Sequence, residues 1–507
     1  MIDVNNLTLF HLPEPKLTFG YNQRLADPRD GLTLFGAFYR ERLKGQINVG
    51  VIGPARQRQA IKSYLQSIHK PVLPDSPDIA RPYFPGLEAV FGIFINFSNL
   101  KEVDVSEKEI GACLEYSDPH QRIHRLCNLY VTRLTSYQKQ EEMPVSVWFV
   151  AISDAIYTYG RPRSRIPTAQ SNIRARLTTK ERQSSEVFLL DEFNKLRDAY
   201  AFEANFHNQL KAKLLEDKII TQIIKESTVG YRDLWNDEKR IEAEKKFDTA
   251  KAWNIATTLY YKAGGLPWKL GDVRRGVCYL GLVYKQMAED NDDRKACCAA
   301  RMFLDSGDGL VFRGNIGPWY NPKTKEYHLE KTDAYDLLSR SLESFKDRPE
   351  TGNYPAEVFI HAKTYFDDEE WAGFTTAANG KSCLVGVRIR DDSPLKLYRD
   401  FSYCVPRGTV LKLSSTKAHL WTKGFIPRLQ TQLGLETPNS LEIEITRGAK
   451  DIKTVCADVL ALTKLNYNSC IFGDGLPVTL RFADRIGEIL TAGRDVEPGV
   501  LPFKHYV

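Results

Sequence analysis

The stretch at residues 253–285, WNIATTLYYKAGGLPWKLGDVRRGVCYLGLVYK, decides how the chain is organised. Its first ten residues have helical spacing, and Gly264-Gly265 end the predicted helix. A connection containing Pro267 follows, and residues 277–285 are apolar enough for a buried strand. This order predicts a joint between two α/β units.

Composition limits the class of protein. A length of 507 residues suggests two to four domains. A hydrophobic content of 42% is enough for large cores. A formal net charge of +6 permits a polyanionic partner without requiring one. Nine cysteines without a CxxC pair indicate reduced thiols rather than a disulfide framework or a zinc site. The N-terminus lacks a secretory pattern and no apolar run is long enough to span a membrane, so we expect a cytoplasmic chain.

The first half of the sequence predicts a parallel sheet. Residues 1–105 are mixed and rich in Pro and Gly, with a turn at 27–31. Helices and strands alternate after residue 105, and this order is typical of a parallel sheet with flanking helices. The predicted strands are 34–39, 47–52, 89–97, 144–152 and 219–224, and the predicted helices are 57–68, 105–142, 189–215 and 248–262.

The second half predicts a mixed sheet. Strands at 277–285, 296–304 and 309–312 have hairpin-like spacing. Helices and strands then alternate as far as the late amphipathic helices at 452–465 and 478–492. An order of hairpin strands, then alternating helices and strands, then late helices favours a ribonuclease-H-like sheet.

Two groups of polar residues are candidates for anion binding. His207 and Lys211 lie four apart on a predicted helix, so they share one face, although each alone is an ordinary surface residue. Gln222 sits within an apolar strand, where a buried amide needs partners. The window 161–182 is strongly basic and could contact nucleic acid or simply face solvent. Its candidate contacts are Arg161, Arg163, Arg165, Arg174 and Arg176.

These segments resemble a known family. Residues 462–468 (LTKLNYN) and 476–484 (LPVTLRFAD) resemble the C-terminal signature of Argonaute PIWI domains, and residues 253–268 resemble the end of an Argonaute MID domain. The resemblance extends to residues 27–35 and 81–91, and so covers nearly the whole chain. The length leaves no room for separate N and PAZ domains, as in the short prokaryotic Argonautes. GGLPWKLGD, GVCYLGLVYK and GPWYNP are most similar to the subgroup paired with a TIR–APAZ protein.

The resemblance implies a fold and its domain limits. Residues 1–105 are expected to form a linker-like segment packed on the MID domain, with MID at 106–270 and PIWI at 271–507. The fold class is then α/β, with a Rossmann-like parallel sheet in MID and a ribonuclease-H-like mixed sheet in PIWI.

The resemblance also implies a pocket for the 5′-phosphate of a guide strand. His207, Lys211, Gln222 and Lys262 match the family pattern, whereas Thr258 stands where many members have a second Lys. The terminal carboxylate of Val507 is expected to join Mg²⁺ that bridges the guide phosphates.

The resemblance also implies that the metal ligands of slicing Argonautes are replaced at matching positions of this sequence. Slicing Argonautes hold two metal ions with four ligands, the first of them an Asp on the first PIWI strand. Val283 stands in that place, Asp484 matches the last ligand, and the later Asp motif is replaced by residues 360–363 (IHAK), which include Lys363. The acidic run at 367–370 is interpreted as a helix start. The resemblance therefore implies a chain that is not itself an enzyme.

The implied function is guided recognition. A small 5′-phosphorylated guide RNA would pair with single-stranded DNA of plasmids or phages. A TIR–APAZ partner in a heterodimer, oligomerising on target binding, would then deplete NAD and cause abortive infection. The alternatives are a sirtuin-like APAZ partner, a guided nuclease with unusual metal ligands, and a standalone binder that silences by occupancy.

Overall fold

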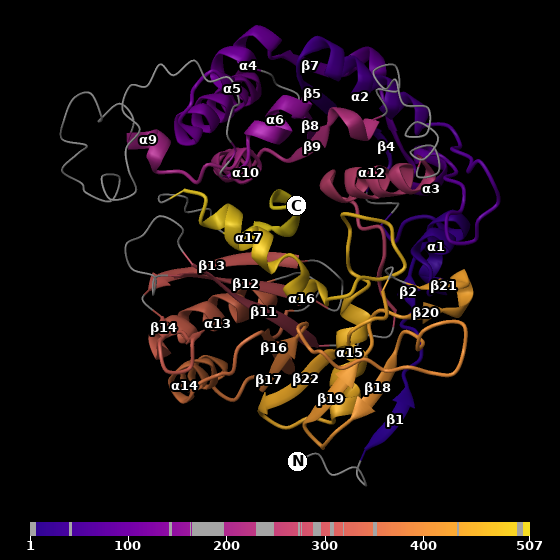
Figure 1. Cartoon of the computed structure of the whole chain (residues 1–507), viewed down its shortest axis with the longest axis vertical. Coiled ribbons are helices and arrows are strands. Elements are labelled where there is room, and N and C mark those ends of the chain that lie inside the picture. The colour runs from indigo at the N-terminus through magenta and orange to yellow at the C-terminus, as the bar shows by residue number, and fades with distance from the viewer. Residues whose placement is uncertain are drawn as a thin grey trace.

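A computed structural model describes most of the chain, in two lobes that lie one above the other (Figure 1). The described residues are all except 1–6, 40–42, 141–143, 163, 165–196, 230–247, 272–273, 275, 287–295, 305–308, 318, 348–351, 433–435 and 494–499.

The four-stranded lobe is built on a parallel sheet whose strand order is β7-β5-β8-β9. The strands are β5 (Val49–Gly53), β7 (Lys101–Asp104), β8 (Val147–Ile152) and β9 (Thr221–Lys225). Helices cover both faces: α2 (Ala55–Ser67) and α12 (Asp248–Lys262) on one, α4 (Glu107–Leu114), α5 (Pro119–Gln140) and α10 (Phe206–Leu214) on the other.

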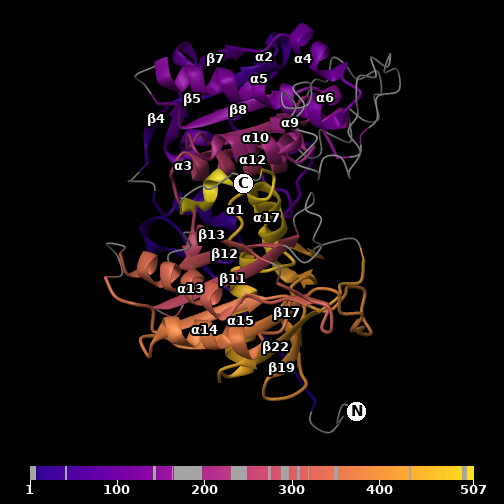
Figure 2. The ribbon, with the colours of Figure 1, turned by 90° about the vertical axis from the view of Figure 1, so that its left-hand side faces the viewer.

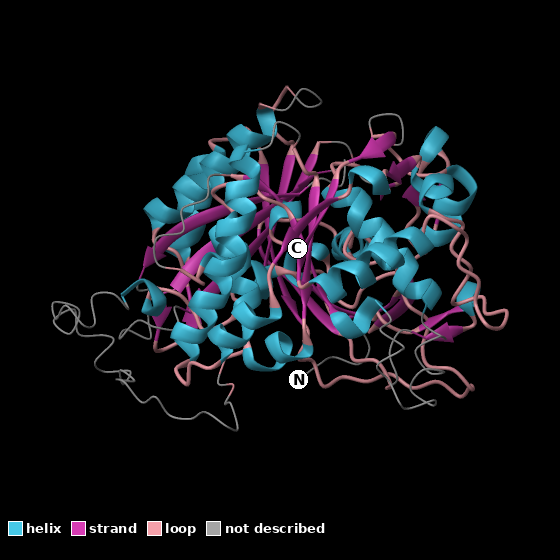
Figure 3. Ribbon diagram, turned by 90° about the horizontal axis from the view of Figure 1, so that it is seen from above, coloured by secondary structure: helices cyan, strands magenta, loops and turns pink. Residues whose placement is uncertain are grey.

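Burial on both faces explains the continuous apolar sequence of β8. Successive side chains of a strand point to opposite faces. Phe149 therefore packs in the core with α2 and α12, whereas Trp148 and Val150 pack with α5 and α10. Figure 3 shows the strands enclosed between helices.

The ten-stranded lobe holds a mixed sheet, ordered β1-β18-β19-β22-β17-β16-β11-β12-β13-β23. The central strands β11 (Val277–Gln286), β16 (Glu357–Ala362) and β17 (Cys383–Arg390) are parallel, and the strands outside them are antiparallel. The flanking strands are β1 (Thr8–His11), β12 (Ala296–Leu304), β13 (Gly309–Gly317), β18 (Thr409–Lys412), β19 (Lys417–Leu420), β22 (Leu441–Arg447) and β23 (Leu501–Pro502).

Helices cover this sheet on both sides. Leu280 and Leu282 pack beneath α13 (Lys331–Lys346) and α14 (Asp368–Ala378). The opposite face lies under α15 (Ile452–Leu462), α16 (Val478–Arg481) and α17 (Ala483–Leu490). Figure 2 shows α17 and the C-terminus between the two sheets.

The joint at residues 253–285 connects the lobes through buried aromatic contacts. Helix α12 ends at Lys262, and Gly264 takes a φ of +107°, which a residue with a side chain rarely adopts. Trp268 is buried and its indole Nε1 donates to Lys464 O at 3.0 Å. Its carbonyl accepts from the hydroxyl of Tyr467 at 2.8 Å, so the connection is fixed to the ten-stranded lobe.

Residues 1–105 do not form one segment packed on the four-stranded lobe, in contrast to the expectation. Strand β1 pairs antiparallel with β18 at the edge of the ten-stranded sheet. Strands β5 and β7 belong to the four-stranded sheet itself. The N-terminal part of the chain therefore contributes strands to both lobes.

The turn predicted at 27–31 is wrong, and residues 34–39, predicted as a strand or the flank of one, contain no strand. Helix α1 (Pro28–Phe35) covers the predicted turn and reaches the start of the second segment, with Asp27 as N-cap accepting from the Arg29 N–H at 2.9 Å. Asp before Pro at the first helical position is a helix-start signal, and Gly36, with a φ of 71°, ends the helix.

Three predicted helices are interrupted. In the described part of 189–215, α9 (Arg197–Tyr200) and α10 are separate helices, and Asn205 caps the second by accepting from the Asn208 N–H. Residues 105–142 form α4 and α5, and Pro119 begins the latter. Residues 478–492 form α16 and α17.

Candidate functional site

The four predicted phosphate-binding residues lie on three elements of the four-stranded lobe. His207 and Lys211 are one turn apart on α10, Gln222 is on β9, and Lys262 is the last residue of α12. The C-terminus lies close to α10 and α12 in Figures 1 and 2. The site is therefore at the boundary of the two lobes.

Hydrogen bonds connect the predicted residues in two pairs. The Lys262 ammonium donates to Gln222 Oε1 at 2.7 Å and to Thr221 O at 2.8 Å. The Lys211 ammonium donates to Val507 O at 2.5 Å. Gln222 is half-buried, and its amide oxygen thus has the partner that its apolar surroundings require.

Both ammonium groups are buried without a carboxylate side chain. Lys211 is 3% exposed and Lys262 is 1% exposed, and no Asp or Glu among the described residues forms an ion pair with either. Burial and then Arg485 lower the pKa of Lys211 to about 7. Burial and then the nearby Lys211 hold the pKa of Lys262 well below its ordinary value. Lys262 donates only to neutral oxygens, and Lys211 donates to one oxygen of Val507. Buried cations that are incompletely compensated are costly, so this arrangement favours an anionic ligand.

His207 belongs to the same cluster of basic groups. Its side chain is exposed at the surface of α10, but partial desolvation by the surrounding protein and the charges of Lys211 and Lys262 lower the pKa of its imidazole to about 4. Its Nδ1 lies 3.1 Å from Asn208 Oδ1, which leaves Nε2 as the other hydrogen-bonding atom. His207, Lys211 and Lys262 therefore act on one another electrostatically.

Sequence reasoning missed two basic residues near this site. His505, buried beside Lys211, has a pKa lowered to about 4 by burial and then by Lys504 and Lys211. Its Nδ1 has no hydrogen-bond partner among the described residues. Arg485 on α17 adds a positive charge that both His207 and Lys211 experience. Both come from the distant end of the sequence, and only the folded chain brings them here.

Thr258, where many family members have Lys, is not a pocket donor in this structure. It is buried, and its hydroxyl donates to Asn254 O at 2.8 Å within α12. The positive charge of the pocket is therefore carried by Lys211, Lys262 and their neighbours.

The positions that match the cutting residues lie together at one end of β11 and β16. Gly281 pairs with His361 across these parallel strands, so Val283 and Lys363, each two residues further on, stand at the same height. Val283 is 8% exposed. The Lys363 ammonium lies 4.0 Å from an oxygen of Asp391. Asp484 is in α17, whose helix packs on β11, but its side chain is outside the described residues.

Close packing of α16 on β11 fixes this region. A Cβ on Gly281 would lie 2.1 Å from Thr479 O, so only glycine fits there. The neighbouring His361 is buried and its Nδ1 lies 3.0 Å from Thr479 Oγ1. Within the described part of the chain, no group of three or more His, Cys, Asp or Glu is arranged to hold a metal ion.

The remaining charged candidates divide into described and undescribed residues. Arg161 stacks over the Tyr157 ring at 3.7 Å. Arg163, Arg165, Arg174 and Arg176 lie outside the described residues. The acidic run at 367–370 begins α14, as predicted, with Asp367 accepting from the Glu370 N–H at 2.8 Å. None of the helices that the model describes is both long and apolar enough to cross a membrane.

Solved structures of Argonautes have this architecture. Clostridium butyricum Argonaute bound to a guide DNA and a 19-mer target DNA matches with a TM-score of 0.66 at 16% identity, covering 100% of this chain and 56% of that one. Aa-Ago with externally bound siRNA matches with a TM-score of 0.55 at 15% identity, covering 98% and 56%. This chain has the Argonaute fold. The predicted fold class, with a parallel MID-type sheet and a mixed PIWI-type sheet, is confirmed.

Sequence similarity to Argonautes is weaker and partial. The Argonaute of Aquifex aeolicus (strain VF5) is 22% identical over 315 residues, which are 62% of this chain and 39% of that protein. No family model matches the chain. The chain thus spans just over half the length of the Argonaute structures and 39% of this relative.

Proposed function

We propose that this chain is an Argonaute that binds the 5′-phosphate of a small guide RNA in the pocket of His207, Lys211, Gln222 and Lys262. The observation that carries the proposal is the pair of buried ammonium groups that converge without a carboxylate side chain. A phosphate dianion would supply the missing negative charge and accept charge-assisted hydrogen bonds from both. His207, neutral at pH 7, would donate to the phosphate or stack on the first base.

The assignment of this pocket is tested by comparing how tightly the protein binds RNA with a 5′-phosphate and RNA with a 5′-hydroxyl. We expect the parent protein to bind 5′-phosphorylated RNA more tightly than 5′-hydroxyl RNA, and Lys211→Met with Lys262→Met to abolish the preference. Methionine keeps the volume of the lysine stem, so the core stays filled. Lys213→Met is the matched control, because Lys213 is on the same helix but donates to Asn128 Oδ1. An unchanged preference in the double variant would refute the assignment.

Magnesium at this pocket is a further part of the proposal. Val507 O would be its ligand from the protein, and this oxygen already accepts from Lys211. Because Mg²⁺ requires near-octahedral oxygen coordination, guide phosphates and water would have to supply the other ligands. Guide binding measured with and without EDTA tests this dependence.

We also propose that the chain binds a target without cutting it. Support comes from Val283 and Lys363 at the matching positions, where an apolar group and an ammonium cannot hold divalent cations. Incubation of the guide-loaded protein with target DNA and Mn²⁺ or Mg²⁺ is the test. A cleaved product would favour the alternative of a nuclease with unusual ligands.

The response to target binding would then be carried out by a partner protein. We propose that the guide-loaded chain recognises complementary single-stranded DNA of plasmids or phages and activates a TIR–APAZ NADase bound to it. Base pairing would read the sequence while the protein holds the strands. Support comes from the resemblance of residues 264–272, 276–285 and 317–322 to that subgroup. Co-purification from the native host, followed by an NAD⁺ consumption assay with guide and target, tests the partner and separates it from a sirtuin-like effector or a standalone binder.

A further inference from the structure

The loop between β17 and β18 carries large aromatic side chains that the protein leaves exposed. Tyr398 is 73% exposed, Phe401 is 66% exposed and Tyr403 is 42% exposed. A single exposed apolar side chain needs no explanation, but a contiguous group of them marks a surface that binds something. Aromatic rings also contribute much contact area when a ligand covers them. This loop is therefore a candidate binding surface.

The aromatic side chains are stacked on one another and on a guanidinium. The rings of Tyr403 and Phe425 lie with their centroids 4.3 Å apart at an interplanar angle of 19°. The centroid of Phe401 lies 6.2 Å from that of Tyr403. The guanidinium carbon of Arg399 lies 4.8 Å from the centroid of Phe401 and 5.7 Å from that of Phe425. We call Tyr398, Arg399, Phe401 and Tyr403, with Phe425 behind them, the aromatic ridge.

Hydrogen bonds to the backbone hold the ridge in place. Arg399 Nε donates to Tyr403 O at 2.8 Å, and the Phe401 N–H donates to Arg399 O at 2.9 Å. The Phe425 N–H donates to Val405 O at 3.0 Å. Side chains that are already ordered lose less conformational entropy when a ligand binds. The ridge is thus exposed and preorganised at the same time.

Positive charge surrounds the ridge. Among the residues that the structure describes, no carboxylate forms an ion pair with Arg399 or with the nearby Lys396 and Lys423. Asp391 and Asp392, in the same loop, pair instead with basic residues outside the ridge. Aromatic rings among cations are the combination by which proteins bind single-stranded nucleic acid, through stacking on the bases and attraction of the backbone.

The ridge lies at the same edge of the ten-stranded sheet as the positions that match the cutting residues. Strand β22 is antiparallel to both β17 and β19, so β16, β17 and β19 run in one direction and end at one edge. The loop of the ridge follows β17, and Phe425 comes shortly after β19. Three strand spacings of ~4.8 Å put β19 about 14 Å from β16. A strand of nucleic acid that passes this edge can therefore reach the ridge.

We propose that the aromatic ridge stacks unpaired bases of the single-stranded DNA target, outside the segment that pairs with the guide. Stacking on a side chain requires a free base face, which the inner base pairs of a duplex do not have. Pairing uses the bases of the guide, whereas a longer target continues as a single strand. Every base has a flat face, so this contact does not depend on the target sequence. The inference rests on the proposed guide-dependent function.

The test compares targets that differ only outside the paired segment. One target ends flush with the guide, and a second carries a single-stranded flank of about ten thymidines, within the site size of single-strand binders. A third carries an abasic flank of the same length, which keeps the phosphates and removes the bases. The flank is placed on the 3′ end in one series and on the 5′ end in another. Affinity is measured with protein loaded with 5′-phosphorylated guide RNA.

Two double variants separate stacking from apolar contact. Tyr398→Leu with Phe401→Leu removes the flat rings but keeps apolar side chains, whereas Tyr398→Phe with Phe401→Tyr keeps the rings. Tyr335→Leu is the matched control, because Tyr335 is a 43% exposed aromatic residue on α13 in the same lobe. Thermal unfolding shows that each variant is folded.

In the parent we expect the thymidine flank at one end to tighten target binding about tenfold, the effect of stacking one base on an aromatic side chain. The abasic flank should tighten binding by less than about twofold. The leucine pair should lose the gain from thymidines and bind the flush target as the parent does. The ring-keeping pair and Tyr335→Leu should retain the gain.

Three results would overturn the inference: no gain from either flank in the parent, an equal gain from the abasic flank, or a leucine pair that keeps the parent's gain. Loss of a co-purifying partner protein from the leucine pair, with no flank effect in the parent, would also overturn it and assign the ridge to that protein. In each case, normal binding of the guide and of the flush target leaves the proposed function intact. Failure of the parent to bind guide would instead contradict the proposed function itself.

Discussion

At the scale of single residues, the proposed guide-end pocket, formed by His207, Lys211, Gln222 and Lys262, carries its positive charge on groups that are easily deprotonated. Lys211 has a pKa of about 7 and Lys262 a pKa well below its ordinary value, whereas His207 and His505 have pKa values of about 4. The two histidines are therefore neutral from pH 6.5 to 9, Lys211 loses its charge within that range, and the pKa of Lys262 is lowered well below that of an ordinary lysine. A bound phosphate favours the protonated lysines, so guide binding should take up protons.

This proton uptake gives a pH dependence with a definite sign. Raising the pH from 7 to 9 should weaken the preference for 5′-phosphorylated over 5′-hydroxyl RNA, because Lys211 must be protonated against a growing penalty. The loss is at most about tenfold per pH unit for each proton taken up. Calorimetry in two buffers of different ionisation enthalpy measures the uptake directly. Lys211→Met should take up fewer protons, and equal uptake in both proteins would contradict this role.

Val283 gives a second prediction at this scale. Val283→Asp places a carboxylate at a position that is 8% exposed, at the height of Lys363. We expect a loss of about 2–3 kcal/mol in the free energy of unfolding, because a poorly paired charge is buried. Cleavage of target DNA should not appear, since one carboxylate does not hold two metal ions. Val283→Leu is the control for packing, and urea unfolding with a cleavage gel provides both measurements.

At the scale of elements, the sequence predicts buried strands well and helix boundaries less well. Strands β8, β11 and β16 are continuous apolar runs, and their pattern suffices because both faces are covered. Helix α1 was missed because Asp27-Pro28 occurs both at turns and at helix starts. The pocket depends on contacts between distant segments, and local patterns do not show that Lys211 reaches Val507 or that His505 lies beside it.

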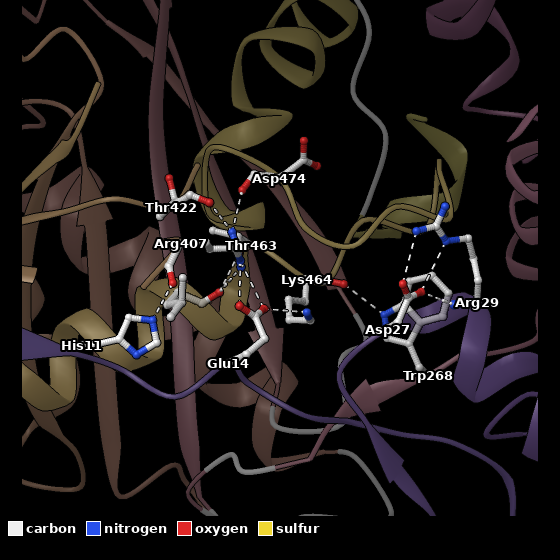
Figure 4. A network of polar contacts seen from close by, with 11 residues as sticks. His11, Glu14, Asp27, Arg29, Trp268, Arg407, Thr422, Thr463, Lys464 and Asp474 are labelled. Atoms are coloured by element: carbon white, nitrogen blue, oxygen red, sulfur yellow. Dashed lines mark hydrogen bonds and ion pairs between the residues drawn. The ribbon is translucent and has the colours of Figure 1, made fainter. Parts of the chain in front are cut away.

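Glu14 links the N-terminal segment to the ten-stranded lobe and can be tested alone. It accepts from Arg407 and from Lys464, whose Nζ lies at 2.7 Å (Figure 4). Glu14→Gln should lower the free energy of unfolding by about 3 kcal/mol, because two buried cations lose their counter-ion. Glu369→Gln, at an exposed position, is the control for removing one acid.

The pH dependence of stability provides a second measurement on the same variant. Burial opposes ionisation of Glu14, but Arg407 and Lys464 outweigh it and lower the pKa of this carboxyl. Its contribution is therefore complete above the unfolded pKa of about 4.3 and is lost as the pH falls through the lower folded value. Glu14→Gln should lack this part of the acid-induced loss. Equal acid sensitivity in both proteins would contradict the assignment.

At the scale of the whole molecule, the two lobes have separate sheets but a shared boundary. The guide-end pocket takes residues from α10, β9 and α12 of one lobe and from the last residues of the chain, which follow the other. Glu488 of α17 lies 3.3 Å from Lys285 of β11 and also accepts from Asn208 at 3.5 Å. Glu488 thus links helix α10, which carries His207 and Lys211, to the ten-stranded sheet, and the proposed guide binding at α10 would be felt in that sheet.

Strand β1 has a consequence for dividing the protein. Cleavage within the joint at 263–276 would leave fragment 1–270 still supplying β1 to β18 and Glu14 to Arg407 of the other fragment. Fragments 1–270 and 271–507 produced from separate genes should therefore assemble into a guide-binding complex and elute together. Removing residues 1–15 from the first fragment should weaken that complementation. The covalent connection between the lobes should then be dispensable for holding them together, and a split-protein reporter of guide loading could be built there.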